Sequence, residues 1–197
     1  MFVRRAILLA GPSGSGKSRL AAMVGCPRLN LDDFYFDADH PGLPRTLGIV
    51  DWDDAATWDA AGAVRMLEEL CLTGRAEVPI YDIATSRRTG SRVVDLGDAT
   101  AFIAEGLFAP EIVPACQAAG MDMEALYLDR PRAQNLVFRF LRDVAEHRKP
   151  LVVLIRRGAA LWRAEPAIRA YAVAQGCRPV SLAEAVRIVS AACRPVR

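Results

Sequence analysis

The chain has 197 residues, of which 52% are hydrophobic and 24% charged, and its formal net charge is +2. This length suits one domain with a sizeable core, and so small a net charge excludes the strongly basic class of nucleic-acid-binding proteins. The longest strongly apolar runs, such as Leu151–Ile155, are too short to cross a bilayer, and the N-terminal residues leave no room for a cleavable signal. We therefore expect a single α/β domain over residues 1–197 that is cytoplasmic and binds neither nucleic acid nor a membrane.

The five cysteines are odd in number, widely spread and without any C-x-x-C spacing. This distribution argues against a zinc site and against a framework of disulfides. We expect all of them to be reduced and structural: Cys26, Cys71, Cys116, Cys177 and Cys193.

The stretch Gly11–Ser18 (GPSGSGKS) follows the apolar run Ala6–Ala10 and precedes a helix-like segment that extends to about Val24. The pattern G-x-x-x-x-G-K-[ST] between a strand and a helix is typical of a loop whose backbone N–H groups bind the phosphates of a nucleoside triphosphate. It predicts that Lys17 reaches the β- and γ-phosphates and that the Ser18 hydroxyl binds Mg²⁺. A Gly/Ser turn before a lysine is the alternative. The predicted ATP-binding residues are Gly11, Ser13, Gly14, Ser15, Gly16, Lys17, Ser18 and Arg19.

Several further elements are expected before residue 100. Arg28–Leu31 reads as a short strand that ends on Asp32-Asp33-Phe34-Tyr35, and His40–Gly48, with two prolines and two glycines, reads as an irregular loop. The apolar spacing in Ala60–Leu72 predicts a helix. Glu77–Asp82 and Arg92–Asp95 read as two strands with a polar connection, which indicates a hairpin arm beside the main sheet.

Strands and helices alternate in the rest of the chain. We expect strands at Ala101–Ala104, Ala125–Leu128 and Gly176–Val180, and helices at Glu111–Ala119, at Pro131 to about Arg148 and after the capping box that begins at Ser181. Leu151–Gln175 is ambiguous, because its first five residues suit a strand whereas Ala159–Ala174 suits a helix that Pro166 interrupts.

Acidic residues follow two of these strands at their C-terminal ends, where α/β sheets place functional groups. Asp32 would share a crevice with the loop and accept the proton of a hydroxyl that attacks the γ-phosphate. Asp33 is the rival for this role, and either residue could instead cap the next turn. Glu105 suits a carboxylate that orients Mg²⁺ directly or through water, although a Glu-Gly pair can simply end a strand.

Two other groups of residues suit a kinase. Arg139 and Arg142 lie one turn apart on a predicted helix and would close over the triphosphate as a lid, unless that helix is an ordinary basic surface. Charge is also uneven along the chain, with eight Asp and one Arg in Leu31–Asp59 but ten Lys or Arg and three acids in Arg130–Arg169. Solvated faces would give the same counts.

Aromatic residues near carboxylates suit a sugar and a flat base, although aromatics also fill cores. The residues of this kind are Tyr35, Trp52, Asp53 and Tyr81.

From Ile7 to about Lys149 these motifs resemble those of the uridine kinase and phosphoribulokinase-like group of P-loop kinases. Besides the GPSGSGKS loop, the similar motifs are Leu31–Tyr35 (D-x-F-Y), Asp51–Asp59 (N-F-D-H-P-x-x-F-D), Val78–Asp82 (P-x-Y-D), Ala104–Gly106 (E-G) and Arg139–Asp143 (R-x-x-R-D). The resemblance implies a P-loop nucleoside triphosphate hydrolase fold. Such a fold has a mostly parallel five-stranded sheet flanked by helices, here with a small β-hairpin arm and a helical lid at about residues 130–160.

The resemblance also implies an ATP- and Mg²⁺-dependent kinase that phosphorylates the ribose 5′-hydroxyl of a nucleoside. It makes Asp32 the base, with Lys17, Arg139 and Arg142 as further catalytic residues and Ser18 and Glu105 at the metal. The implied acceptor-binding residues are Asp33, Tyr35, Trp52, Asp53, Tyr81, Ser86 and Arg88.

The sequence departs from uridine kinases at the position of their pyrimidine-contacting histidine, which is Ser86 here. The Asp-Asp-Phe and Asp-Trp-Asp stretches also resemble nicotinamide riboside kinases. Other acceptors therefore stay open, among them nicotinamide riboside, a sugar or a pantothenate-like alcohol. A regulatory P-loop module with slow ATP hydrolysis is the alternative from a different class, and homo-oligomers are compatible with every one of these alternatives.

Overall fold

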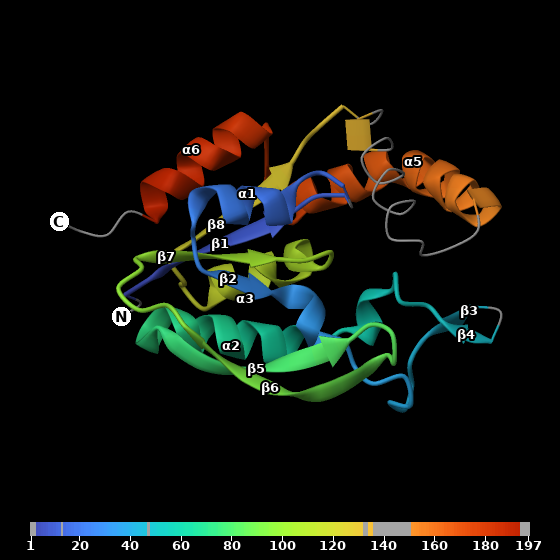
Figure 1. The fold of residues 1–197 in the computed structure, drawn as a ribbon, viewed down its shortest axis with the longest axis horizontal. Helices are drawn as coiled ribbons and strands as arrows, with labels where there is room; N and C mark the ends of the chain where they lie inside the picture. The colour runs from blue at the N-terminus through green and yellow to red at the C-terminus, as the bar shows by residue number, and fades with distance from the viewer. Residues whose placement is uncertain (1–2, 13, 47, 132–133, 136–150, 194–197) are drawn as a thin grey trace.

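A computed structural model describes residues 3–12, 14–46, 48–131, 134–135 and 151–193. Its centre is a five-stranded sheet in the order β2–β7–β1–β8–β9, in which every neighbouring pair is parallel (Figure 1). The strands are β1 (Arg5–Ala10), β2 (Arg28–Asn30), β7 (Ala101–Glu105), β8 (Met123–Leu128) and β9 (Arg178–Val180). The predicted fold class, a mostly parallel five-stranded sheet flanked by helices, is confirmed.

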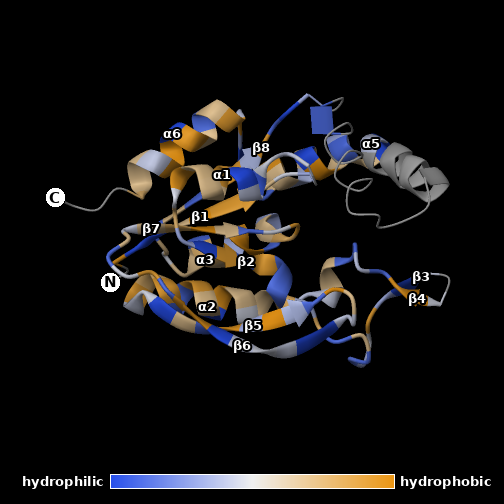
Figure 2. Cartoon of the chain, viewed as in Figure 1, coloured by the Kyte–Doolittle hydropathy of each residue, from blue (hydrophilic) through white to orange (hydrophobic). Residues whose placement is uncertain are grey.

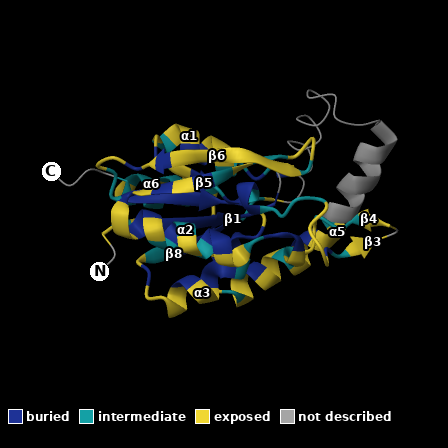
Figure 3. Ribbon diagram, turned by 90° about the horizontal axis from the view of Figure 1, so that it is seen from below, coloured by how far each residue is buried: buried dark blue, intermediate teal, exposed yellow. Residues whose placement is uncertain are grey.

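Helices cover both faces of this sheet, which explains why its central strands read as continuous apolar runs. On one face, α1 (Lys17–Val24) and α6 (Leu182–Ala192) pack against Ile7, Leu9 and Ile103. On the other face lie α2 (Ala60–Thr73), α3 (Val113–Ala118) and the last turns of α5 (Leu151–Ala174). Figure 3 shows the buried strands of the sheet and the exposed outer faces of α2 and α3.

The predicted hairpin arm is present and longer than expected, with β5 (Arg75–Asp82) antiparallel to β6 (Arg87–Asp95). β6 is almost entirely exposed and largely hydrophilic (Figure 2), which is why its first half does not read as a strand in the sequence. The smaller elements are η1 (Leu31–Phe34), β3 (Arg45–Thr46), β4 (Ile49–Val50), η2 (Ala55–Thr57) and η3 (Ala109–Ile112).

The ambiguous segment is one long helix, α5, and Pro166 lies inside it without ending it. A proline removes one helical hydrogen bond. Packing of Ile168 and Ala172 against the core outweighs that loss in this helix. Among the residues that the structure describes, none of the helices combines the length and the apolar composition of a membrane-spanning segment.

The expectation that every cysteine is reduced is wrong for two of the five. Cys26 follows the end of α1, Cys193 follows the end of α6, and the two form a disulfide across a sequence separation of 167 residues. They meet because α1 and α6 lie side by side on one face of the sheet, and spacing in the sequence carries no sign of this (Figure 1). Cys71, Cys116 and Cys177 are buried and free, and burial raises the pKa of Cys71 to about 12.

Close approach of two chain segments also requires a glycine at residue 106, directly after β7. A Cβ atom there would lie 2.6 Å from Leu31 Cβ and 3.1 Å from Asp32 Oδ1. Gly106 thus lets η1 pack against the end of β7, so that the strand ends carrying Asp32 and Glu105 become neighbours.

We predict that reducing the Cys26–Cys193 disulfide destabilises the protein. A cross-link closing so long a loop stabilises a fold by about 5 kcal/mol on the chain-entropy account. Urea unfolding with and without a phosphine reductant measures the difference, and a Cys26→Ser/Cys193→Ser variant should not respond to the reductant. Three reactive thiols are expected in the denatured, unreduced protein, since three cysteines are free. Five thiols would contradict the cross-link.

We also predict that Gly106→Ala destabilises the protein by about 1–3 kcal/mol, because the added methyl group forces η1 away from β7. Gly90→Ala is the matched control, since a Cβ at Gly90 in β6 meets nothing within 4 Å. Denaturant unfolding of both variants makes the comparison. Equal stability of the two variants would show that the close approach at Gly106 is unimportant.

Candidate functional site

The phosphate-binding motif lies at the C-terminal edge of the sheet, where β1 ends. Gly11, Gly14 and Gly16 have φ angles of 144°, 86° and 97°, in the region that favours glycine. A Cβ on Gly11 would lie 3.0 Å from Ser15 Oγ and 3.2 Å from Leu128 Cβ. A larger residue at this position would therefore prevent the loop from adopting its observed conformation. Ser13 lies outside the described residues.

α1 begins in this loop, and its first N–H groups have no side-chain cap because Gly16 occupies the N-cap position. Uncapped N–H groups at the positive end of a helix favour an anion. Lys17 Nζ donates to the carbonyls of Gly11 at 2.6 Å and Pro12 at 3.3 Å, which keeps its ammonium at the loop. Arg19, also predicted to bind ATP, is exposed on the same helix. The loop therefore concentrates positive charge where phosphates would bind.

Ser18 and Glu105 lie together beside this loop. Ser18 Oγ donates to Glu105 Oε1 at 3.0 Å, and Glu105 is 4% exposed. Glu105 Oε2 is buried and has no hydrogen-bond partner among the described residues. In that part of the chain, no cluster of three or more His, Cys, Asp or Glu side chains could hold a metal ion. Two oxygen groups beside a phosphate loop nonetheless suit Mg²⁺, which takes few protein ligands and completes its shell with phosphates and water.

Asp32 and Asp33 sit in different surroundings within η1, which the Asn30 side chain caps by accepting from Asp32 N. Asp32 Oδ1 accepts from the Leu107 N–H at 3.3 Å. Burial raises the pKa of Asp32, while the Leu107 hydrogen bond and the Lys17 charge oppose the increase. Asp33 is buried, and its Oδ2 accepts from Arg92 Nη2 at 3.2 Å. Asp33 is thus held by an ion pair to the hairpin.

An aromatic cluster lies next to Asp32. The Tyr35 ring centroid is 5.7 Å from that of Trp52, 5.6 Å from that of Tyr81 and 5.8 Å from that of Phe108. Burial and then the charges of Asp32 and Asp53 raise the pKa of Tyr35, which places both carboxylates within electrostatic reach of its phenol. The structure thus brings together four of the predicted acceptor-site residues, from segments that are up to about a quarter of the chain apart in sequence: Tyr35, Trp52, Asp53 and Tyr81.

The hairpin closes the outer side of this cluster through Ser86 and Arg88. Ser86 has a φ of 52°, and its carbonyl accepts from Ala38 N at 3.0 Å. Burial raises the pKa of Tyr81, and a hydrogen bond with the Ser86 side chain opposes that increase. Arg88 donates to the carbonyls of Tyr35 at 3.1 Å and Phe34 at 3.2 Å. These bonds fasten the hairpin to the segment that follows Asp32.

Two arginines that the sequence reasoning did not single out lie at the same edge. Arg130 follows the end of β8, and its guanidinium atoms lie 3.7–3.9 Å from where a Cβ on Gly16 would be. Arg28 begins β2, and its Nη1 donates to Glu105 Oε1 at 2.7 Å. Sequence reasoning could have identified Arg130 from its position just after a predicted strand. No sequence pattern distinguishes Arg28 in the same way. Arg139 and Arg142 lie outside the described residues.

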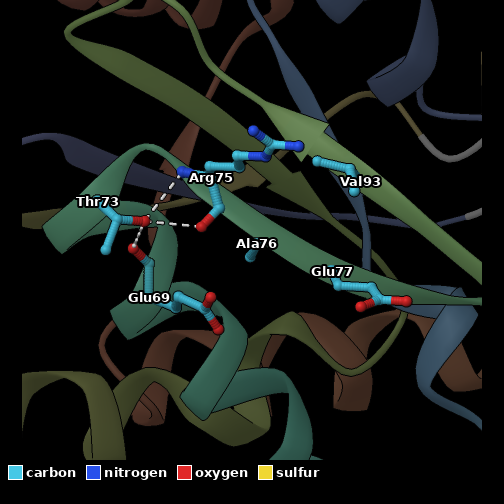
Figure 4. A pocket seen from close by; sticks show the side chains of 6 residues that line it. All are labelled: Glu69, Thr73, Arg75, Ala76, Glu77 and Val93. Atoms are coloured by element: carbon cyan, nitrogen blue, oxygen red, sulfur yellow. Dashed lines mark hydrogen bonds between the residues drawn. The ribbon is translucent and has the colours of Figure 1, made fainter.

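An open hollow of about 420 Å³ lies away from this edge (Figure 4). It is lined by Glu69, Thr73, Arg75, Ala76, Glu77 and Val93. The Thr73 hydroxyl bonds its own neighbours there, donating to the carbonyls of Glu69 and Arg75 and accepting from the Arg75 N–H. The end of α2 lies beside the start of β1, since Val3 N and Arg4 N donate to Cys71 O. The hollow is therefore at the opposite end of the sheet from the loop.

No protein-family model matches the chain. Inorganic pyrophosphatase TTM2 from Arabidopsis thaliana is 32% identical over 108 residues, which cover 51% of this chain and 15% of that protein. The chain thus spans about a seventh of the length of this curated relative.

Among solved structures, one described as a "putative fructose transport system kinase" from Silicibacter sp. TM1040 is 21% identical, with a TM-score of 0.51. The alignment covers 98% of this chain and 87% of that chain. A possible uridine kinase from Bacillus stearothermophilus has a TM-score of 0.47 at 22% identity, over 74% of this chain and 82% of that chain. The YGR205w protein has a TM-score of 0.47 at 16% identity, over 84% and 78%. Together with the parallel sheet and the glycine loop at the end of β1, the first of these structures shows that the chain shares its P-loop fold.

Proposed function

We propose that this protein is an ATP- and Mg²⁺-dependent kinase that transfers the γ-phosphate to a primary hydroxyl of a small molecule. The observation that carries the proposal is the position of Asp32. Its carboxylate, in η1 directly after β2, accepts from the Leu107 N–H and interacts electrostatically with Lys17 of the loop and with Tyr35 of the aromatic cluster. A nucleotide switch needs the loop but has no use for a carboxylate at this place.

Phosphoryl transfer requires mainly positioning and stabilisation of charge. In the proposed mechanism the N–H groups at the start of α1 and the ammonium of Lys17 bind the β- and γ-phosphates. Ser18 would be a direct ligand of Mg²⁺, and Glu105 would hold one of its waters. When bound, Mg²⁺ neutralises charge on the phosphate oxygens. Arg139 and Arg142 are proposed from the sequence to cover the leaving phosphate.

Asp32 is the proposed general base. It would accept the proton of the acceptor hydroxyl as that oxygen attacks the γ-phosphorus. Asp33 is the weaker candidate because Arg92 already holds one of its oxygens. Tyr35, Trp52, Asp53 and Tyr81 would hold the acceptor, with the aromatic rings against its flat or apolar part and Asp53 on its hydroxyls.

The ribose 5′-hydroxyl of a nucleoside is the acceptor that the motifs favour most, as in uridine kinases. Ser86 replaces the histidine that reads a pyrimidine there, so nicotinamide riboside, a sugar and a pantothenate-like alcohol remain alternative acceptors. The similar structure from Silicibacter sp. TM1040, which is described as a transport-system kinase, supports the general activity. A cytoplasmic location and a homo-oligomeric state remain predictions from the sequence.

ADP release over a panel of acceptors tests this proposal. We expect a nucleoside or a related hydroxyl compound to increase ADP release well above the rate with ATP and Mg²⁺ alone. Pyrophosphate replaces ATP in a parallel reaction, because the curated relative is named a pyrophosphatase. An ADP release that no acceptor increases would indicate a regulatory module, and rapid cleavage of pyrophosphate would indicate a hydrolase.

Asp32→Asn should lower turnover by about two or more orders of magnitude, since general base catalysis contributes 10²- to 10⁴-fold. ATP affinity should be nearly unchanged, because Asp32 has no role in binding the loop phosphates. Steady-state kinetics and nucleotide titration give the two quantities. Asp122→Asn serves as the control, because this carboxylate is exposed and pairs with Arg5 at the opposite edge. Near-normal turnover of Asp32→Asn would remove Asp32 from the mechanism.

A further inference from the structure

Arg28 contacts the carboxylate that the proposed function assigns to the metal. Its Nη1 lies 2.7 Å from Glu105 Oε1, the same oxygen that accepts from Ser18 Oγ at 3.0 Å. The Arg28 side chain is 45% exposed, whereas that of Glu105 is only 6% exposed. Glu105 therefore loses far more hydration than Arg28 does, and most of the desolvation free energy of the pair belongs to its carboxylate. Arg28 is the cation that pairs with this buried carboxylate.

The parallel register explains how this contact forms. Arg28 pairs with Ile103, and Asn30 pairs with Glu105, so Arg28 lies two residues back along the neighbouring strand. Residues two apart on adjacent strands share a face and lie about 7–8 Å apart, which a long arginine side chain spans. Arg28 thus reaches along the sheet surface to the end of β7.

The two oxygens of Glu105 consequently have different surroundings. Oε1 receives both the guanidinium and the serine hydroxyl, whereas Oε2 is buried without a hydrogen-bond partner in the described part of the chain. Two bonds to one oxygen fix the rotation of the carboxylate. They hold the Ser18 hydroxyl beside Oε1 on the side of the loop, while Oε2 stays buried.

We propose that Arg28 is a positioning residue for the metal site, acting on Mg²⁺ through Glu105 and Ser18 without touching substrate. This role rests on the proposed function for the site but concerns metal binding alone. It applies only when metal and nucleotide bind together, since the protein offers Mg²⁺ few ligands and the nucleotide phosphates supply others. Loss of Arg28 would free the carboxylate to rotate and weaken the metal, as outer partners of metal ligands typically do by 10- to 100-fold.

Binding of a non-hydrolysable ATP analogue with and without Mg²⁺ tests this role. The Kd measured in EDTA divided by the Kd measured in saturating Mg²⁺ gives the contribution of the metal. We expect Arg28→Met to reduce this ratio by about tenfold or more while the Kd in EDTA stays near the wild-type value. Arg28→Lys should restore part of the ratio, because an ammonium can still donate to Glu105 Oε1.

Arg5→Met is the matched control. Arg5 has the same side-chain exposure of 45% and a comparable ion pair of 2.9 Å, with Asp122, but lies at the start of β1. Its ratio should equal that of the wild type. A ratio for Arg28→Met within twofold of the wild type would overturn the proposal. An equal weakening of analogue binding in EDTA and in Mg²⁺ would also overturn it, since a general structural role predicts that outcome. If Arg28→Met does not fold, the ratio measured for Arg28→Lys decides.

Because the analogue carries no transferable phosphate, this result is independent of the acceptor. A shift in the ratio without any acceptor-dependent ADP release would support the metal role and refute the kinase. Acceptor-dependent ADP release with an unchanged ratio would support the kinase and refute the metal role of Arg28.

Discussion

Parallel pairing of β1 with β7 and β8 is the constraint on which the candidate site depends. In this register Leu9 pairs with both Glu105 and Leu126, so the strands end together. Backbone pairing alone therefore brings the loop after β1 close to the carboxylate at the end of β7. β2 joins the same edge through its pairing with β7, which brings Asp32 beside Glu105. A sheet with one antiparallel central strand would separate these groups by the length of that strand.

Glycine and burial then determine what each group can do. Gly106 allows η1 to approach β7 closely, and that approach gives Asp32 both its burial and its hydrogen bond from Leu107. Asp33, one residue further, points to the hairpin and pairs with Arg92. Two adjacent carboxylates with the same chemistry thus acquire different surroundings, one held in an ion pair with Arg92 and one accepting from the Leu107 N–H.

The sequence predicted the elements that depend on local pattern. The loop, the strands before Asp32 and Glu105, the Ser181 cap and the hairpin were all visible as spacing, apolar runs or turn residues. Contacts between distant segments were not visible, because nothing local distinguishes them. The Cys26–Cys193 disulfide and the Arg28–Glu105 pair both depend on which elements lie side by side. The helix break predicted at Pro166 is wrong for a related reason, since packing against the core overrides local helix propensity.

We propose that the loop and Asp32 serve one transfer of phosphate to a bound hydroxyl. The most direct measurement follows a heavy oxygen isotope from the γ-phosphoryl group of ATP into the products, by mass spectrometry, with an accepted nucleoside or alcohol present. We expect the label to appear in a phosphorylated acceptor. Label found only in inorganic phosphate would contradict it.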